Sequence, residues 1–391
     1  MTLSQPLVTI VTPSYNQGHF IRATIESVLS QGYPNVEYLI MDGGSTDATA
    51  AVAAEYSSRL TFVSEKDRGQ THAINKGFQR ANGSIVAWLN SDDVYLPDAI
   101  AHGVAGLAAH PEVGAIYGEG FQIDYDGNVR QQFPFTEPFN LWKLTFVLDY
   151  VLQQSVFFRR SCVEAVGWAD EALHFGMDWD LLIRLAKRYG LAYVPEKFGC
   201  IREYEAAKSF AGGQRRFQEL AALLSRHTGR RCPPGWWFYG LDTYDKIWAE
   251  RIRKVVPGSL GEYLATRFIH LCRAGIDEVY RHSQGLYADQ WAGTRLHWML
   301  PEYARAAVIR GTLPGWARPL EDQEFCIRVN GKLAVRKVVP LGDFVMEVPL
   351  RQGEACVLQI DSARYMIPEE QGHGPDRRRL AWQLRQIEAV R

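Results

Sequence analysis

The sequence predicts an α/β protein with a mostly parallel sheet in its N-terminal half, followed by a helical segment and a small antiparallel β domain. From Leu7 to about Val194, apolar strand-like runs alternate with helical patterns over short links. This rhythm is typical of a parallel sheet with helices on both faces. From Phe325 onward, short runs of alternating polarity surround the dipeptide Asn330-Gly331, which is a strong hairpin signal.

The first predicted strand, at 7–12, is apolar and β-branched throughout, as expected of a strand buried on both faces. A helix follows it, because Ile21, Ile25 and Val28 recur on one helical face. The next elements follow in order: a strand at 36–41, a helix from Thr46, a strand at 60–63, a helix at 73–80 and a strand at 84–89.

Beyond Asn90 the rhythm loosens. A helix is expected at 179–189, because basic residues occupy its last turn and Gly190 follows as a stop signal. The short strands expected before it lie at 115–117, 121–123 and 155–158.

The C-terminal half changes character twice. Residues 213–310 are helical in pattern and rich in Trp, Tyr and Arg, and the stretch 312–318 with Pro314 and Gly315 suggests a linker. The β domain is expected to close with a basic helix at 380–390. We therefore divide the chain into three domains, at 1–212, 213–311 and 312–391.

Composition restricts the class of protein. The 391 residues carry a formal net charge of −1, so no global field favours nucleic acid as a partner. Six cysteines are spread without a C-x-x-C pair, which favours free thiols in a reducing compartment over zinc or disulfides. No signal peptide is recognised at the N-terminus, and no apolar run approaches the roughly 20 residues of a membrane span. We expect a cytoplasmic protein, with contact at the inner face of a membrane left open.

Polar residues gather after the first four predicted strands. The segments are Thr12-Pro-Ser-Tyr-Asn16, Asp42-Gly-Gly-Ser-Thr-Asp47, Ser64-Glu-Lys-Asp-Arg-Gly69 and Asn90-Ser-Asp-Asp93. Each alone is compatible with a turn or a helix cap. Because ligands of open parallel sheets bind past the carboxyl ends of the strands, the four together predict a binding site at one edge.

The adjacent carboxylates of Asp92 and Asp93 need a counter-charge, because like charges side by side are unfavourable. Mg²⁺ or Mn²⁺ would supply it, since hard cations take carboxylate and phosphate oxygens. Such an ion would also neutralise the charge that develops on a leaving diphosphate. The pair therefore predicts a divalent metal together with a diphosphate-containing substrate.

At this point the motifs resemble those of glycosyltransferase family 2. The resemblance rests on the segments above, on Asn75-x-Gly77 and on Trp88-Leu-Asn-Ser-Asp-Asp93, and it extends over about residues 6–210. It implies a GT-A-like domain that binds a nucleotide-diphosphate sugar and transfers the sugar with inversion to a glycan or glycolipid acceptor. UDP-sugar is the default donor, and surface polysaccharide synthesis is the expected process.

The resemblance assigns nucleotide-side roles to residues after the first three strands. Tyr15 would stack on the base, with Thr12 and Pro13 shaping the same pocket. Asp42 would accept a hydrogen bond from the base or ribose, and Asp67 would lie on the same side.

The resemblance also assigns the acidic groups of the reaction. Asp93 corresponds to the metal-binding position, and Asp92 stands beside it near the ribose and sugar, so both are expected to serve the metal. Asp178, in Met177-Asp-Trp-Asp-Leu181, matches the general base that takes the acceptor's proton. A simple helix N-cap is the other reading of Asp178, and Asp180 is the rival base.

Further segments resemble the acceptor side, at 153–159 and 167–171, and a mobile loop over the diphosphate, at 201–209. Arg202 and Lys208 of that loop would contact the diphosphate, unless they belong to a solvated basic loop. Many relatives have a histidine where Tyr204 stands, which weakens a phosphate or metal role at that position.

Two features of the C-terminal half leave alternatives open. The first is a basic cluster near Trp236-Trp237, which comprises Arg215, Arg216, Arg230 and Arg231. This cluster could anchor a helix on anionic lipid, although packing of the helices on the transferase domain is favoured. The β domain suits carbohydrate binding or oligomerisation.

Two other functions compete with transfer. A nucleotidyltransferase would need a glycine-rich phosphate loop after the first strand, where Thr12-Pro-Ser-Tyr-Asn16 stands instead. A non-catalytic sugar-nucleotide-binding protein would not need to keep Asp92, Asp93 and Asp178 together, and turnover with and without EDTA separates it from an enzyme.

Overall fold

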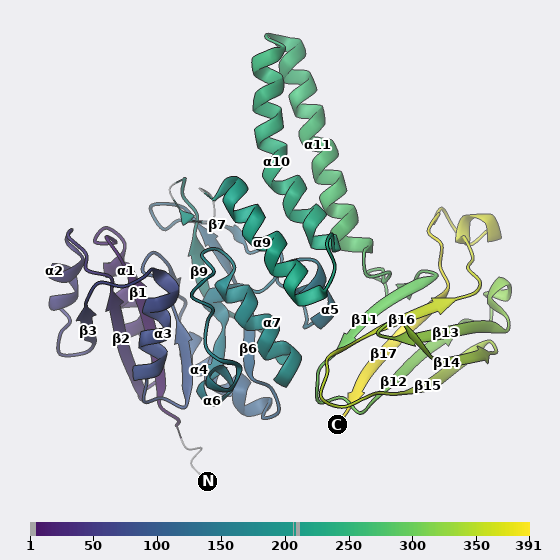
Figure 1. Ribbon diagram of the computed structural model, residues 1–391, viewed down its shortest axis with the longest axis horizontal. Coiled ribbons are helices and arrows are strands. Elements are labelled where there is room, and N and C mark those ends of the chain that lie inside the picture. The colour runs from purple at the N-terminus through teal and green to yellow at the C-terminus, as the bar shows by residue number, and fades with distance from the viewer. Residues whose placement is uncertain (1–4, 206, 209–211) are drawn as a thin grey trace. The chain divides into compact units, whose positions relative to one another are not determined.

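The computed structural model describes residues 5–205, 207–208 and 212–391. They form two compact units, one built from residues up to 139 with 149–223 and the other from 140–148 with 224–391 (Figure 1). Residues 1–4, on which the expectation about a signal peptide partly rests, lie outside the described residues, as do Ala206 and Ser209 of the predicted mobile loop.

The first unit is built on one large sheet. Within the described residues its nine strands follow the order β3-β2-β1-β4-β8-β6-β9-β5, with β7 beside β6. The pairs among β3, β2, β1 and β4 are parallel, as is β6 with β9, whereas β8, β5 and β7 pair antiparallel. The strands are β1 (Val8–Ser14), β2 (Val36–Asp42), β3 (Thr61–Ser64), β4 (Ile85–Trp88), β5 (Val94–Tyr95), β6 (Ala115–Ile123), β7 (Val129–Gln132), β8 (Phe157–Arg159) and β9 (Leu191–Arg202).

Helices cover both faces of this sheet. Apolar side chains of α1, α2 and α4 pack with Val8 and Ile10 of β1 in one core cluster. Helix α3 lies on the other face, where a Cβ at Gly77 would come within 2.3 Å of Val11 Cγ1. The predicted α/β fold is therefore confirmed. The helices are α1 (Ile21–Leu29), α2 (Thr49–Ala54), α3 (Gln70–Arg80), α4 (Ala99–Ala109), η1 (Gln153–Ser155), α6 (Arg160–Val166) and α7 (Met177–Tyr189), and α9 (Gly213–Thr228) begins in this unit and ends in the next.

The second unit combines helices with two four-stranded antiparallel sheets, of order β10-β17-β12-β15 and β11-β16-β13-β14. Both sheets contribute to one apolar core, so they form a sandwich. The predicted turn is confirmed, because Asn330 and Gly331 join β13 to β14 with positive φ angles of 48° and 82°. Its elements are α5 (Leu141–Phe146), α10 (Pro234–Val255), α11 (Ser259–His282), β10 (Trp291–Ala292), β11 (Arg295–Leu300), β12 (Ala306–Leu313), η2 (Arg318–Leu320), β13 (Gln323–Val329), β14 (Lys332–Val339), β15 (Gly342–Pro349), β16 (Cys356–Ser362), η3 (Pro368–Gln371) and β17 (Trp382–Val390).

Two expectations about this half are wrong. The β structure begins at Trp291, so the helical pattern ends at His282 and the start of the expected linker belongs to β12. The expected C-terminal helix is strand β17, paired with β12. A β-bulge leaves Arg385 without a partner in the register, and this extra residue interrupts the alternation of polarity that would have indicated a strand.

Among the helices of the described residues, none combines the length and the apolar character that crossing a membrane requires. The six cysteines all lie in the described residues and form no disulfide.

Candidate active site

The first three strands end side by side at one edge of the large sheet. In the parallel register Ser14 pairs with Asp42, and Asp42 pairs with Ser64. Leu89, which follows β4, donates to the carbonyl of Val11 at 3.0 Å. The polar segments after these strands therefore leave the sheet at the same edge, as their order in the sequence predicted.

Asp42 organises the turn that follows β2. Its carboxylate accepts hydrogen bonds from the backbone N–H groups of Gly44 and Ser45 at 3.1 and 2.9 Å, and from the hydroxyls of Ser45 and Ser64. The side chain is buried, and both oxygens are occupied by donors of the chain itself. Its contact with a base or ribose stays a prediction.

The ends of β2 and β3 meet at Gly43 and Asp67. A Cβ on Gly43 would lie 2.8 Å from Asp67 Oδ2, so a larger residue at this position would displace the Asp67 carboxylate. The other Asp67 oxygen accepts the N–H of Gly69 at 2.8 Å. Asp42 and Asp67 thus lie close together at the ends of β2 and β3, the part of the site to which the resemblance assigns the nucleotide.

Tyr15 follows β1 directly, and its side chain is 62% exposed. The next residue holds this loop against the β2 turn, because Asn16 Oδ1 accepts the N–H of Thr46 at 2.9 Å. The ring is therefore free to stack on a planar ligand. Thr12 and Pro13 are buried in β1, and Thr12 shares a hydrogen bond of 3.1 Å with Tyr38, so they lie beneath the surface rather than on it.

The two members of the acidic pair differ in their surroundings. Asp93 is 2% exposed and accepts hydrogen bonds from Gln154 Nε2 at 2.5 Å, Asn90 Nδ2 at 3.0 Å and Arg202 N at 2.8 Å. Asp92 is only partly buried, and its carboxylate accepts the hydroxyl of Tyr204 at 2.9 Å. Among the described residues, three donors thus enclose Asp93, whereas one side chain donates to Asp92.

The charge of this pair is poorly compensated. Burial and the charge of Asp92 raise the pKa of Asp93 to about 7, and burial also raises the pKa of Asp92. Arg202 is buried close by, but its guanidinium donates to the backbone carbonyls of Asp92, Asp124 and Tyr125. Arg202 is therefore held in the interior rather than in a solvated loop.

A chain of hydrogen bonds leads from the acidic pair to Lys208. Asn90 donates to Asp93, Gln70 Nε2 donates to Asn90 Oδ1 at 2.8 Å, and Lys208 Nζ donates to Gln70 Oε1 at 2.7 Å. Burial lowers the pKa of Lys208, while the nearby charge of Asp178 opposes that shift. Lys208 therefore lies between the acidic pair and Asp178.

Asp178 lies in the first turn of α7. It accepts the N–H of Trp179 at 2.8 Å, and burial raises its pKa. Asp180 is buried and forms an ion pair of 2.8 Å with Arg184. Of the two acids in this motif, only Asp178 lacks a basic side chain bonded directly to it within the described part of the chain.

A further acid, Asp149, was not identified from the sequence. Burial and the charge of Asp178 raise its pKa well above the ordinary carboxyl range. Two neighbouring carboxyl groups cannot both ionise cheaply, so the charge of Asp178 disfavours the charged form of Asp149. No local motif marks Asp149, which is 29 residues away from Asp178.

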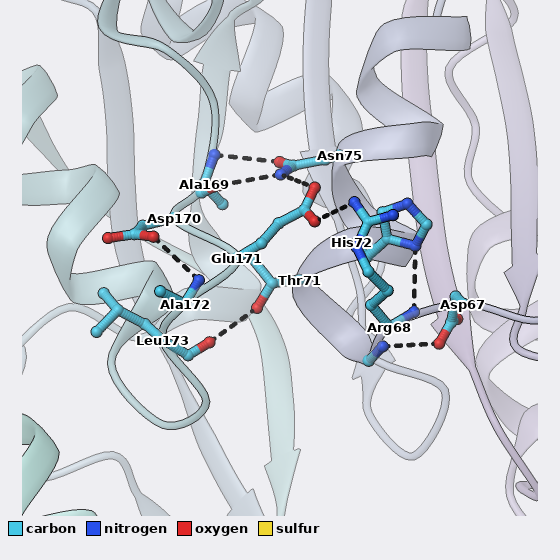
Figure 2. A network of polar contacts seen from close by, with 11 residues as sticks. Asp67, Arg68, Thr71, His72, Asn75, Ala169, Asp170, Glu171, Ala172 and Leu173 are labelled. Carbon is cyan, nitrogen blue, oxygen red and sulfur yellow. Dashed lines mark hydrogen bonds and ion pairs between the residues drawn. The ribbon is translucent and has the colours of Figure 1, made fainter.

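Helix α3 holds the segment that leads to α7. Figure 2 shows Asn75 facing Ala169, with reciprocal hydrogen bonds of 2.9 and 3.1 Å between the amide and the backbone. Glu171 lies between Asn75 and Arg68 and bonds to both, and Thr71 donates to the carbonyl of Leu173 at 3.2 Å. These contacts link the loop that contains Asp67 and the start of α3 to the segment that precedes Asp178.

Glu219 of α9 holds the end of the same segment. Its carboxylate accepts three consecutive backbone N–H groups, from His174 at 3.0 Å, Phe175 at 2.6 Å and Gly176 at 2.9 Å. These groups directly precede Met177, the first residue of α7. The sequence gives no signal for Glu219, because a lone glutamate on a helix does not indicate a contact 43 residues away.

Comparison with known proteins identifies the family of this chain. The sequence model described as Glycosyl transferase family 2 matches residues 9–164. An uncharacterised glycosyltransferase of Mycobacterium tuberculosis is 30% identical over 186 residues, which cover 47% of this chain and 70% of the relative. The chain belongs to glycosyltransferase family 2, and its first unit has the GT-A type of fold.

Two other relatives cover less of their own length. An uncharacterised glycosyltransferase of Rickettsia prowazekii is 28% identical over 45% of this chain and 57% of its own. The O-antigen biosynthesis protein RfbC of Myxococcus xanthus is 29% identical over 58% of this chain and 18% of its own. The chain thus spans little more than half of the Rickettsia relative. Among solved structures, the mannosyltransferase PcManGT of Pyrobaculum calidifontis, in complex with GDP-Man and Mn²⁺, is similar with 19% identity and a TM-score of 0.49, over 71% of this chain and 85% of the other.

Proposed function

We propose that this chain transfers a sugar with inversion from a nucleotide-diphosphate donor to a hydroxyl of a glycan or glycolipid, with the help of a divalent cation. The observation that supports the proposal is the hydrogen-bonded chain from Asp93 through Asn90 and Gln70 to Lys208, which ends beside Asp178. A diphosphate site and a base on opposite sides of one sugar are what inverting displacement requires.

For the cation, we propose Asp92 as the ligand in place of Asp93. Asp93 is enclosed by three donors, whereas Asp92 is more accessible and accepts one hydroxyl. The fit is good because the charge of Arg202 compensates the pair only in part and the pKa values of both acids stay raised, and a cation at Asp92 would lower both.

In the described residues no three His, Cys, Asp or Glu side chains could hold a metal by themselves. Mg²⁺ suits such a site, since it typically uses one or two protein carboxylates together with substrate phosphates. Bound there, it would supply Lewis-acid stabilisation of the leaving diphosphate.

The chain's own residues would do the remaining work. Asp178 would take the proton of the acceptor hydroxyl, while its charge disfavours ionisation of the neighbouring Asp149. Lys208 would keep Asp178 ionised and add positive charge on the diphosphate side. Tyr15, exposed at the edge of the sheet, would stack on the base, and uridine is the expected base.

The expected process is surface polysaccharide or glycolipid synthesis at the cytoplasmic side of the cell. The similarity to RfbC, an O-antigen biosynthesis protein, supports this part of the proposal. Oligomerisation through the C-terminal half stays a prediction.

The test begins with thermal shifts of the full chain against a panel of nucleoside diphosphates with Mn²⁺, since a preferred ligand raises the melting temperature. Turnover of the matching radiolabelled sugar donor is then measured with and without EDTA. The proposal expects turnover that EDTA abolishes. Binding of a nucleotide without any turnover would favour the non-catalytic alternative instead.

A matched pair of variants tests the residue assignments. Asp178→Asn should keep nucleotide affinity and lose on the order of 10³-fold in transfer rate, the upper part of a general-base contribution. Asp180→Asn is the control for the same helix, and it should lose stability without a comparable loss of rate in the folded protein. Equal rates for Asp178→Asn and the unmodified chain would refute the base.

A further inference from the structure

The helical hairpin of α10 and α11 carries large apolar side chains that nothing in the second unit covers. The two helices pack along each other and are joined by a short turn at 256–258 (Figure 1). Seven large hydrophobic residues of these helices, Tyr263 and six others, are between 40 and 79% exposed. We call these six residues the apolar face: Trp237, Trp248, Val255, Leu260, Leu264 and Leu271.

These side chains lie on one side of the hairpin. In α10 they are spaced by 11 and 7 residues and in α11 by 4 and 7, spacings that return to the same side of a helix. Most of them directly precede a buried residue of the seam between the helices, as Trp248 precedes Ala249 and Leu264 precedes Ala265.

On each helix, the exposed apolar residues therefore lie roughly 100° around the helix axis from the residues that face the other helix, and the sense of this rotation is the same for both helices. In two antiparallel helices that face each other, the same sense of rotation leads to the same side. The exposed apolar residues of the two helices therefore form one continuous surface.

The charges beside the apolar face are cationic. The guanidinium of Arg251 lies 4.8 Å from the centre of the Trp248 ring, and Arg267 donates to the Tyr263 hydroxyl at 3.4 Å. Within the described residues, neither arginine forms an ion pair.

The acids of this end of the hairpin are already paired elsewhere. Glu250 bonds to Lys254 at 2.6 Å and Glu262 to Arg253 at 3.0 Å. Residues 247–267 contain four cationic and two acidic side chains. The hairpin end thus joins exposed apolar groups to uncompensated positive charge.

We propose that the apolar face docks on a membrane surface rich in anionic phospholipid. Val255, Leu260 and Leu264, next to the turn, would enter the boundary between headgroups and acyl chains. Arg251 and Arg267 would reach lipid phosphates while their aromatic partners stay at the interface, as amphipathic side chains do at membranes. The excess of cations favours this partner over a second copy of the hairpin, which would bring like charges together.

The docking is tested by co-sedimentation of the full chain with vesicles of phosphatidylglycerol and phosphatidylcholine, and with vesicles of phosphatidylcholine alone. Binding is expected on the anionic vesicles only, and it should weaken in about 1 M salt, where the screening length is about 3 Å. Arg251→Gln with Arg267→Gln should lower the affinity about 10- to 30-fold, since each cation near an anionic surface contributes about fivefold.

The apolar contribution is tested with the triple variant Val255→Ser, Leu260→Ser, Leu264→Ser, whose binding should fall at least about tenfold. The matched control replaces three exposed apolar residues of the β sandwich, Leu333→Ser, Val338→Ser and Val345→Ser, which are 50 to 58% exposed. The control should bind like the unmodified chain.

An independent measurement does not depend on the folding of the triple variant. Val255→Cys in a Cys232→Ser background carries an environment-sensitive fluorophore, whose emission should shift to shorter wavelength with anionic vesicles. Equal loss of binding in hairpin and control variants, or no shift of the label, would overturn the proposal. So would light scattering that shows a dimer lost in the triple variant, because the face would then join two copies.

Discussion

Replacement of Glu219 tests how the structure positions the base. Glu219→Ala removes the acceptor of three consecutive N–H groups, those of His174, Phe175 and Gly176. Phe175 and Gly176 are at least partly buried, whereas His174 is exposed enough to bond to water instead. Two backbone donors therefore lose their partner without replacement.

The size of the effect follows from these two donors. A buried donor left without its partner costs about 1–3 kcal/mol, so we expect a loss of about 2–3 kcal/mol in the free energy of unfolding. For a unit of this size, that loss corresponds to about 4–12 °C in melting temperature. The released segment directly precedes Asp178, and a displacement of about 1 Å there would lower kcat about 10²-fold.

The assay measures thermal unfolding, kcat and KM at a temperature where every variant is folded. Glu219→Gln keeps one accepting oxygen and should fall between the alanine variant and the unmodified chain. Gln218→Ala, at an exposed position on the same helix, is the control and should change neither quantity. Full kcat in a folded but destabilised Glu219→Ala variant would show that the hydrogen bonds to Glu219 stabilise the fold but do not position the base.

Three further predictions concern charge and packing. Because burial raises the pKa of Asp178, the rate should fall with falling pH at a midpoint above the ordinary value of about 3.9, and a pH–rate profile without that limb would contradict the assignment. A raised carboxyl pKa contributes stability that is present below the ordinary pKa and is lost as the pH rises through the folded-state value, so Asp178→Asn should melt higher than the unmodified chain at pH 7. Asp92→Asn should abolish stimulation by Mn²⁺ in a chain of normal melting temperature. Asp93→Asn should instead lower the melting temperature, because donors face both carboxylate oxygens and the NH2 group of an amide would meet one of them; the reverse pattern would return the metal to Asp93. Gly77→Ala should destabilise the first unit by about 1–3 kcal/mol, measured by urea unfolding, since its Cβ would meet Val11 at 2.3 Å, and an unchanged midpoint would refute the close packing of α3.

The alternation of strands and helices, and the polar segments that end each strand, could be predicted from the sequence because both depend on local chemistry. Periodicity of apolar residues specifies which face of an element is buried, and glycine next to aspartate specifies a turn. The Asn330-Gly331 hairpin was predictable for the same reason, because both residues adopt the positive φ angles the turn demands.

Contacts between distant residues decided the rest. Whether Asp92 or Asp93 is enclosed depends on Gln154 and Arg202, which come 61 and 109 residues later than Asp93. The nearness of Asp178 to Asp149 joins residues 29 positions apart, and Glu219 of α9 reaches the segment before α7 from 43 residues away. Residues 382–390 form strand β17 because they pair with β12, and the β-bulge in that pairing interrupts the alternation that would have indicated a strand. Local patterns specify elements, whereas burial and charge at a site are properties of the assembled fold, since they depend on neighbours that the chain brings together from afar.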